Sequence, residues 1–384
     1  MTKTYTESGM DTEGARVAES STTEEALVAE AIATEPSAAE PSAAEPSAND
    51  LSSSERSVRG VQTLSMAKAI TAGLREALRG DEKVLLMGED IGSLGGVFRV
   101  TEGLKDEFGE RRVLDTPLAE SGIVGTAIGL AMRGYRPVLE IQFDGFIFPA
   151  FDQITTQLSR QTLRHDGKIS MPIVIRVPYG GHIGSIEHHQ ESPEAYFAHT
   201  PGLRVVSPSN PHDAYWMIQE AIASNDPVLY FEPKSRYWPK GPVDLDHAGL
   251  PLHVSRIMRQ GTDVTVVGHG AMIATLLQAA DIAAEEGTSL EVVDLRSLSP
   301  IDYGPLLDSV QRTGRLVVAQ EASGNASLGS EIAATVAERA FYSLEAPVLR
   351  VSGFDTPFPP AALETEFLPS PDRVLEAVDR VLAF

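Results

Sequence analysis

Apolar residues recur at helical spacing from Thr63 onward and lead into a short apolar run at 84–88. The residues that share this spacing are Met66, Ala69, Ile70, Gly73, Leu74, Ala77 and Leu78. More apolar runs, each short enough for a buried strand, follow at 137–143, 172–177, 203–206 and 227–232. The helices predicted between them are 120–132, 148–163, 193–199 and 211–223. This alternation of strand and helix predicts a parallel sheet covered on both faces.

A second alternating set begins at Asp263, after a stretch at 233–258 that is rich in Pro, Gly and Asp and is interpreted as a linker. Its predicted strands are 263–268, 290–295, 316–319 and 347–351, and its predicted helices are 271–286, 304–312, 328–341 and one from Pro371. The sequence therefore predicts the α/β class with two doubly wound domains, at 61–245 and 246–384.

The first 60 residues differ in composition from the rest of the chain. Tyr5 is their only aromatic residue, and the pentapeptide Glu-Pro-Ser-Ala-Ala begins at Glu35 and at Glu40, with a shortened copy at Glu45. Such a segment cannot bury enough apolar surface to offset the entropy of ordering it, so residues 1–60 are predicted to be a disordered acidic tail. Two interpretations stay open, a tether or docking arm within a large assembly and an unconstrained extension.

The 384 residues carry a formal net charge of −23; 12 acidic and 4 basic residues place −8 in the first 60 and leave −15 for the rest. No basic stripe is present, so nucleic acid is not an expected partner. The chain has no cysteine, which excludes disulfides, thiolate metal sites and a cysteine nucleophile and is compatible with a reducing cytosol. The longest apolar run, around Ile123–Met132, is broken by glycines, so no membrane span is expected and a soluble, cytoplasmic protein is predicted.

The most informative stretch is 112–125, where a turn at Pro117 brings Glu120 to the start of an apolar run spaced by glycines. The small residues of that run lie at 122, 125, 126, 127 and 129 and let a helix approach another backbone closely. A carboxylate that loses water at such a position has a raised pKa and can act as an acid or base near neutral pH. The alternative is a carboxylate that interacts with the free backbone N–H groups of the helix start.

Two further candidate positions follow predicted strands. Glu89 comes directly after the strand at 84–88, at the sheet edge where ligands of α/β proteins bind, although a solvated turn residue explains it equally well. Gln142 lies near the end of the strand at 137–143 and is followed by phenylalanines that reach to Phe151. Clustered aromatic side chains belong more often to a core than to a cofactor site, so both interpretations stay open.

A polar loop at 178–193 carries three of the nine histidines, His182, His188 and His189. Their spacing admits a zinc site, but adjacent histidines on a loop in a chain without cysteine favour a proton-handling histidine instead. The loop also contains three glycines, at 180, 181 and 184, which predict that it moves when the site is empty and becomes ordered over a bound ligand.

These motifs resemble those of the β subunit of the thiamin-diphosphate-dependent decarboxylating component of 2-oxoacid dehydrogenase complexes. The resemblance runs from Thr63 to Phe384, and the segments that carry it are 88–92, 96–99, 115–122, 192–195, 231–234, 291–296, 344–348 and 353–359. Within that family, three segments look closer to the branched-chain enzymes than to the pyruvate enzymes, namely 147–153, 195–202 and 354–359. The resemblance implies a thiamin pyrimidine-binding domain followed by a transketolase C-terminal-like domain.

By position, the resemblance also implies a cofactor site and a catalytic set. The residues that it assigns to cofactor binding are Leu118, Glu120, Gln142 and Phe146. Glu120 would exchange a proton with the pyrimidine ring of thiamin diphosphate. His189 matches the histidine of the family's active-site loop and would act in acyl transfer, and Glu89 would relay protons between two sites.

The turn after the predicted helix at 211–223 has two interpretations. A helix end that is capped in the ordinary way explains it without any ligand. The resemblance implies instead a structural potassium ion held by main-chain carbonyl groups, and the residues that match by position are Ile173, Ala221, Ser224 and Asp226.

The absence of one motif indicates which part of the cofactor another subunit would hold. Thiamin enzymes hold the diphosphate through Mg²⁺ with a Gly-Asp-Gly motif and a downstream Asn, and this sequence contains no Gly-Asp-Gly. The resemblance therefore implies an α subunit that binds the diphosphate and Mg²⁺, in an α2β2 heterotetramer. It also implies a small 2-oxo acid as substrate and acyl transfer to the lipoyl domain of a dihydrolipoyl acyltransferase core. The alternatives are a pyruvate dehydrogenase β subunit and a non-catalytic α/β assembly subunit.

Overall fold

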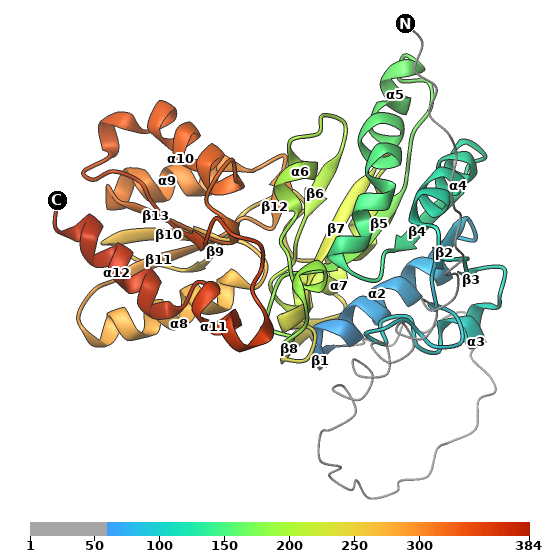
Figure 1. The fold of residues 1–384 in the computed structure, drawn as a ribbon, viewed down its shortest axis with the longest axis horizontal. Helices are drawn as coiled ribbons and strands as arrows, with labels where there is room; N and C mark the ends of the chain where they lie inside the picture. Colours follow the sequence, from blue (N-terminus) through green and yellow to red (C-terminus); the bar gives the residue numbers. More distant parts are fainter. Residues whose placement is uncertain (1–59) are drawn as a thin grey trace, which may run out of the picture. The chain divides into compact units, whose positions relative to one another are not determined.

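A seven-stranded sheet organises the first domain in the computed structural model, which describes residues 60–384 (Figure 1). Its strands, in spatial order, are β12 (Ser297–Ser299), β6 (Arg204–Val206), β7 (Val228–Pro233), β5 (Val174–Tyr179), β4 (Arg136–Glu140), β2 (Val84–Gly88) and β3 (Val113–Asp115). Neighbouring strands are parallel, except that β12 runs antiparallel to β6. The predicted tail at 1–60 lies outside the described residues but for Gly60.

The side chains of each strand alternate between the two faces of this sheet, and helices pack on both faces. The helices of the first domain are α2 (Met66–Gly80), α3 (Leu104–Phe108), α4 (Glu120–Met132), α5 (Gln161–Arg164), α6 (Glu194–Ala198) and α7 (Pro211–Ala223). Val84 and Leu86 of β2 lie in the core with α2 and α7, whereas Leu85 and Met87 lie in the core with α4. The alternation is that of a central strand buried on both faces.

The second domain is built on a five-stranded sheet. Its strands, in spatial order, are β14 (Leu349–Gly353), β13 (Leu316–Ser323), β10 (Val264–Gly268), β11 (Leu290–Asp294) and β9 (Arg256–Arg259). Its helices are α8 (Met272–Glu285), α9 (Tyr303–Thr313), α10 (Leu328–Arg339), α11 (Glu364–Phe367) and α12 (Pro371–Leu382). Helices α8 and α12 share the core on one face of this sheet, and α9 and α10 lie on the other face (Figure 1).

Two α/β domains with mainly parallel sheets confirm the fold class predicted from the sequence. Helices α4 and α7 cover the ranges 120–132 and 211–223 that apolar spacing predicted. The described residues belong to one compact unit, so the domain boundary expected between 245 and 246 stays a prediction.

The segment interpreted as a linker, 233–258, contains regular structure. Strand β8 (Lys240–Asp244) pairs antiparallel with β1 (Val61–Ser65), and β9 joins the edge of the second sheet. Most residues of β1 and β8 are partly or fully exposed, so these strands carry no apolar run. Hydropathy therefore gives no sign of them.

The helix predicted at 148–163 is irregular. The chain forms 3₁₀ and π turns from Asp144 to Arg160 before the short helix α5. The hydroxyl groups of Thr155, Thr156 and Ser159 donate to the carbonyl groups four residues earlier, at 2.8, 2.9 and 2.7 Å. Such bonds compete with the regular helical ladder, which explains the irregularity.

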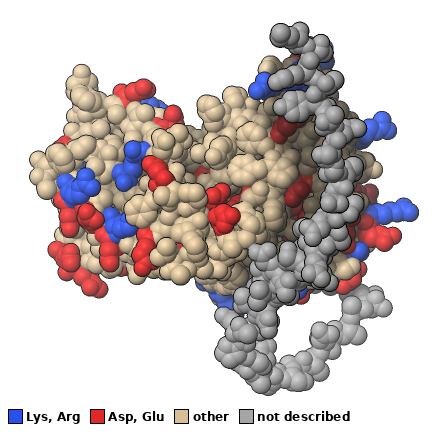
Figure 2. All heavy atoms as spheres, in the orientation of Figure 1, with Lys and Arg blue, Asp and Glu red and all other residues tan. Residues whose placement is uncertain are grey.

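Within residues 60–384, no helix is both long and apolar enough to cross a bilayer. On the face drawn in Figure 2, basic side chains lie among acidic ones over the second domain. The cytoplasmic location expected from the sequence stays a prediction.

Arg176 of β5 carries a buried positive charge at the centre of the first sheet. Its guanidinium group donates to Glu140 of β4 at 2.6 Å and to both carboxylate oxygens of Glu232 of β7 at 2.7 and 2.9 Å. The hydroxyl of Tyr237 also donates to Glu232, at 2.5 Å. Because three adjacent strands contribute one charged member each, the group aligns the ends of these strands.

Replacing Arg176 with Ala should lower the free energy of unfolding by about 3–5 kcal/mol, because two buried carboxylates would lose their counter-charge. Arg79→Ala is the matched control, since Arg79 is half-exposed and its ion pairs with Glu76 and Glu107 should contribute about 1 kcal/mol or less. Urea titrations followed by circular dichroism measure both. Equal losses in the two variants would contradict the role assigned to Arg176.

Candidate active site

The residues singled out from the sequence gather where parallel strands of the first sheet end. Glu89 follows β2 and Gln142 follows β4. The histidine loop, residues 180–193, connects β5 to α6, and Glu120 is the first residue of α4, which follows β3. The carboxyl ends of parallel strands meet at one edge of the sheet, where α/β proteins bind ligands. The structure therefore places the catalytic candidates along one edge.

Glu89 and Glu120 form a pair of neighbouring carboxylates at this edge. Both residues are buried, with 8% of each exposed. Burial raises the pKa of Glu89 and the charge of Glu120 raises it further, against the Ala119 N–H that donates to the Glu89 carboxylate. The Oε1 atom of Glu89 is buried and has no hydrogen-bond partner among residues 60–384. A buried acceptor without a partner marks a place for a further donor.

The other residues predicted to contact the cofactor lie at the same edge and leave part of it exposed to solvent. The side chain of Gln142 approaches the residue after Glu89, with its Nε2 atom 3.5 Å from Oδ2 of Asp90. Phe146 is half-buried, whereas Leu118, two residues before Glu120, is 80% exposed. The site is therefore open at Leu118.

Aromatic rings hold His189 against the segment that follows β4. The His189 ring lies 4.1 Å from the ring of Phe143 and 5.3 Å from the ring of Phe146, edge to face in both cases. Phe98, from the loop after β2, packs on Phe143 at 5.5 Å. The phenylalanines after β4 thus serve the site as well as the core. Phe143, which the sequence did not single out, makes the closer contact.

His189 is held in its neutral form. Burial lowers its pKa to about 4, helped by the charges of His188 and Lys234 and opposed by Glu187. Its Nδ1 atom is buried and has no hydrogen-bond partner within the described part of the chain. The same residues contain no group of three His, Asp or Glu side chains arranged to hold a metal ion, so the zinc interpretation of this loop gains no support.

A buried ion pair behind His189 was not predicted. Lys234, directly after β7, donates to Asp144 at 2.6 Å, and both side chains are fully buried. The other Asp144 oxygen accepts the N–H of Glu191 at 2.8 Å, which ties down the end of the histidine loop. Burial raises the pKa of Asp144 to about 6 despite Lys234. The available signal was a lysine directly after a buried strand, where a charge needs a partner.

The proposed potassium ligands lie together at the end of α7, and their carbonyl groups already accept hydrogen bonds. The four residues are Ile173, Ala221, Ser224 and Asp226, whose carbonyl groups accept from Val228 N, Ser224 N, Arg136 Nη1 and Ser224 Oγ. Arg136 also donates to the carbonyl groups of Ile222 and Ala223, so a positive charge already stands at this helix end. Because a carbonyl oxygen has two lone pairs, one accepted hydrogen bond still leaves a lone pair for an ion. Potassium binding at this helix end stays a prediction.

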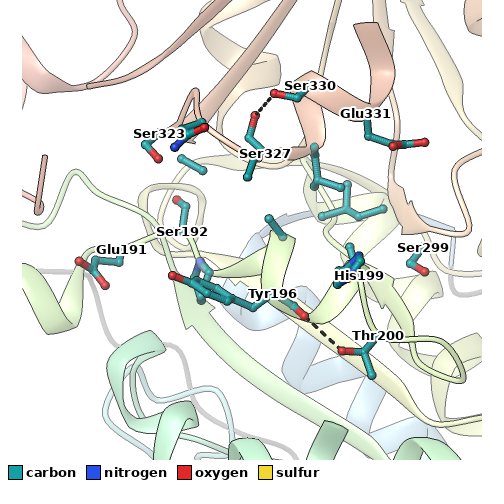
Figure 3. Close-up of a pocket in the computed structure, with 18 of the residues that line it drawn as sticks. Glu191, Ser192, Tyr196, His199, Thr200, Ser299, Ser323, Ser327, Ser330 and Glu331 are labelled. Atoms are coloured by element: carbon teal, nitrogen blue, oxygen red, sulfur yellow. Dashed lines mark hydrogen bonds between the residues drawn. The ribbon is translucent and has the colours of Figure 1, made fainter. Parts of the chain in front are cut away.

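A pocket of about 1400 Å³ opens beside the end of the histidine loop (Figure 3). Glu191 and Ser192 of the loop line one side, and Ser330 and Glu331 of α10 line the opposite side. None of the site residues predicted from the sequence lines this pocket. It is therefore distinct from the edge that carries Glu89 and Glu120.

Two family models match consecutive parts of the chain. The transketolase pyrimidine binding domain matches residues 62–239, and the transketolase C-terminal domain matches residues 254–374. A solved structure titled split gene transketolase, inactive beta4 tetramer, is similar with a TM-score of 0.70 and 24% identity over 83% of this chain and 98% of that one. At this identity, the likeness supports the fold alone.

Relatives with high identity match segments of nearly the same length. The chain is 72% identical over 324 residues to the pyruvate dehydrogenase E1 component subunit beta of Leifsonia xyli subsp. xyli, covering 84% of this chain and 96% of the relative. It is 52% identical over 322 residues to the 3-methyl-2-oxobutanoate dehydrogenase subunit beta of Mycobacterium tuberculosis, covering 84% and 92%. It is 45% identical to the pyruvate dehydrogenase E1 component subunit beta of Bacillus subtilis, covering 84% and 99%. These relatives do not single out the branched-chain type.

We expect the His189 ring to stay uncharged between pH 8 and pH 5, because its pKa is about 4. Because this value lies below that of the unfolded chain, protonation favours unfolding, and the contribution of His189 to stability declines as the pH falls from about 6.5 towards 4. Ring ¹⁵N NMR shifts, assigned with His189→Gln, measure the charge. The chain unfolded in urea is the control, and a folded-state midpoint near 6.5 would contradict the expectation.

Proposed function

Because this chain belongs to the family of β subunits of the thiamin-diphosphate-dependent decarboxylating component of 2-oxoacid dehydrogenase complexes, we propose that it decarboxylates a 2-oxo acid together with an α subunit. The acyl fragment passes to a lipoyl domain of a dihydrolipoyl acyltransferase core. The observation that carries this proposal is the buried pair Glu89 and Glu120, with one acceptor oxygen left without a partner among residues 60–384. A non-catalytic assembly subunit has no use for such a pair.

The residues at this edge fit the pyrimidine half of thiamin diphosphate. Buried polar atoms without partners within residues 60–384, such as Glu89 Oε1 and His189 Nδ1, are where ligand atoms belong. Glu120 would exchange a proton with the pyrimidine ring. The side chains that would hold the cofactor with it are Leu118, Gln142 and Phe146. Bound there, thiamin diphosphate supplies the electron sink for the loss of carbon dioxide.

The α subunit of this proposal completes the site in an α2β2 heterotetramer. It holds the diphosphate and Mg²⁺, for which this sequence has no Gly-Asp-Gly motif. The exposure of Leu118 fits an edge that another chain covers. A structural potassium ion at the end of α7 belongs to the same proposal. It would bind the carbonyl oxygen of Ser224, which already accepts a hydrogen bond from Arg136.

Each catalytic side chain takes a role that its surroundings support. Glu120 exchanges a proton with the pyrimidine ring, and Glu89, whose pKa is raised by burial and by the charge of Glu120, relays protons between the two sites of the tetramer. His189 is neutral at pH 7 and can donate a hydrogen bond to the substrate carboxylate or to the lipoyl sulfur during acyl transfer.

For the substrate, we propose a branched-chain 2-oxo acid, on the basis of the segments 147–153, 195–202 and 354–359. Pyruvate is the second candidate, because the relative that is 72% identical carries the name of a pyruvate dehydrogenase subunit. The two acids differ in the size of the apolar group beside the 2-oxo carbon. An apolar pocket discriminates between substrates that differ by one methylene by about 1–3 kcal/mol of transition-state binding. A comparison of kcat/KM values resolves such a difference.

The test is co-expression of the chain with its α partner and assay of 3-methyl-2-oxobutanoate and pyruvate with thiamin diphosphate and Mg²⁺. Decarboxylation that needs both chains supports the proposal, and the ratio of kcat/KM for the two acids assigns the substrate. Failure of the chain to bind α, or no decarboxylation of either acid by the assembled chains, would overturn it.

Glu120→Gln should reduce decarboxylation about 10²- to 10⁴-fold, the usual scale for removing a proton-transfer group. An amide keeps the size of the side chain but cannot exchange the proton. The measurement is kcat at saturating cofactor, with size-exclusion chromatography to show that the assembly persists. Glu110→Gln is the control, since Glu110 is exposed on the loop before β3. Activity of Glu120→Gln near that of the unmodified enzyme would remove Glu120 from the mechanism.

A further inference from the structure

Two carboxylates of the second domain hold the first turn of the histidine loop. Glu321 of β13 accepts the N–H of Gly181 at 3.2 Å. Glu364, the first residue of α11, accepts the N–H of Gly184 at 3.2 Å with Oε2 and the N–H of His182 with Oε1. Three N–H groups within four residues therefore donate to side chains more than 130 residues away in the sequence.

Two glycines make this close approach possible. A Cβ atom on Gly180 would lie 2.4 Å from Oε2 of Glu321, and Gly180 has a φ of +81°. A Cβ atom on Gly181 would lie 2.8 Å from Cδ1 of Leu368 and 3.1 Å from Oε1 of Glu364. Real Cβ contacts are essentially never shorter than 3.0 Å. These glycines thus bring the backbone against the carboxylates, a second use beside the mobility that the sequence predicts for the loop.

The next residue, His182, has a φ of +71°, a conformation that a residue with a Cβ rarely adopts. Such strain persists only where the surroundings determine the backbone. Here Glu364 accepts the His182 N–H, and Oε1 of Glu321 lies 3.9 Å from the ring Nε2 atom. Both carboxylates therefore contact the residue that adopts this conformation.

The first turn of the loop is connected to the part that carries His189. Gln190 is fully buried; its Oε1 atom accepts the N–H of Ile183 at 3.3 Å, and its Nε2 atom donates to the carbonyl of Ser185 at 2.5 Å. At the base of the loop, the Gly180 N–H donates to the carbonyl of Glu191 at 3.0 Å. A displacement of the first turn would therefore move the neighbour of His189.

We propose that Glu364 and Glu321 form a carboxylate clamp through which the second domain positions His189 for acyl transfer. The proposal rests on the function proposed above, and it names residues that neither the sequence motifs nor the comparisons assign. Both are positioning residues, because they hold the loop backbone rather than a reacting group. Formation of the reactive cofactor depends on Glu120 and not on the clamp.

The experiment compares Glu364→Ala and Glu364→Gln in the assembled α-containing enzyme. Glu364→Ala removes both acceptors, whereas Glu364→Gln keeps one oxygen and the shape of the side chain. Hydrogen–deuterium exchange of residues 181–186 should rise about tenfold in Glu364→Ala and less in Glu364→Gln, the scale expected for losing hydrogen bonds to a charged group. Glu366→Gln, an exposed change on α11, is the matched control and should leave exchange unchanged.

Two rates then separate positioning from general damage. Acyl transfer to a lipoyl domain should slow about tenfold in Glu364→Ala, while exchange of the acidic proton of bound thiamin diphosphate should change less than about twofold. Unchanged loop exchange in Glu364→Ala, or faster loop exchange with unchanged acyl transfer, would overturn the clamp. His189→Ala separates this outcome from failure of the proposed function. Normal acyl transfer in His189→Ala would remove the role proposed for His189. The exchange of residues 181–186 in Glu364→Ala would still test whether the clamp holds the loop.

Discussion

The charge of Arg176 is the constraint on which the rest of the site depends. It joins Glu140 of β4 and Glu232 of β7 across β5, and the ends of these strands lead to part of the functional site. Strand β4 leads to Gln142 and β5 to the histidine loop. A buried ion group adds little stability compared with apolar packing, but its partners must all be satisfied in one arrangement. The strand ends therefore cannot slip relative to one another without leaving a charge exposed to the apolar core.

The buried polar groups of this domain are of two kinds. Asp144 and Lys234 pair with each other and stabilise the segment beneath the histidine loop. In contrast, Oε1 of Glu89 and Nδ1 of His189 are buried without a partner among the described residues. Leaving such an atom unsatisfied costs about 1–3 kcal/mol, so a chain that had to fold and work alone would gain by replacing it. This distribution of paired and unpaired groups supports the proposed function, in which a ligand and an α subunit complete the site.

Sequence patterns predicted the elements whose burial follows a regular pattern along the chain. Central parallel strands such as β2 appear as apolar runs, and α4, whose buried positions recur at helical spacing, starts at Glu120 after a non-helical segment that contains Pro117. Exposed strands such as β8 carry no such run and were not predicted. The candidate site was found through local motifs around Glu120 and His189. Glu364 was missed because its contacts to the histidine loop span about 180 residues of sequence, and no local pattern records such a contact.

Strand β12 belongs by sequence to the second half of the chain but lies at the edge of the first sheet, where Ser297 pairs with Val206 and Ser299 with Val205. The two halves of the chain therefore cannot be separated between the two sheets without removing a strand from the first sheet. A fragment that ended before β12 would leave β6 paired with β7 alone, with its other edge open, and open strand edges recruit other chains. The first sheet would keep a paired edge at β6 only in a fragment that carried β12 with it.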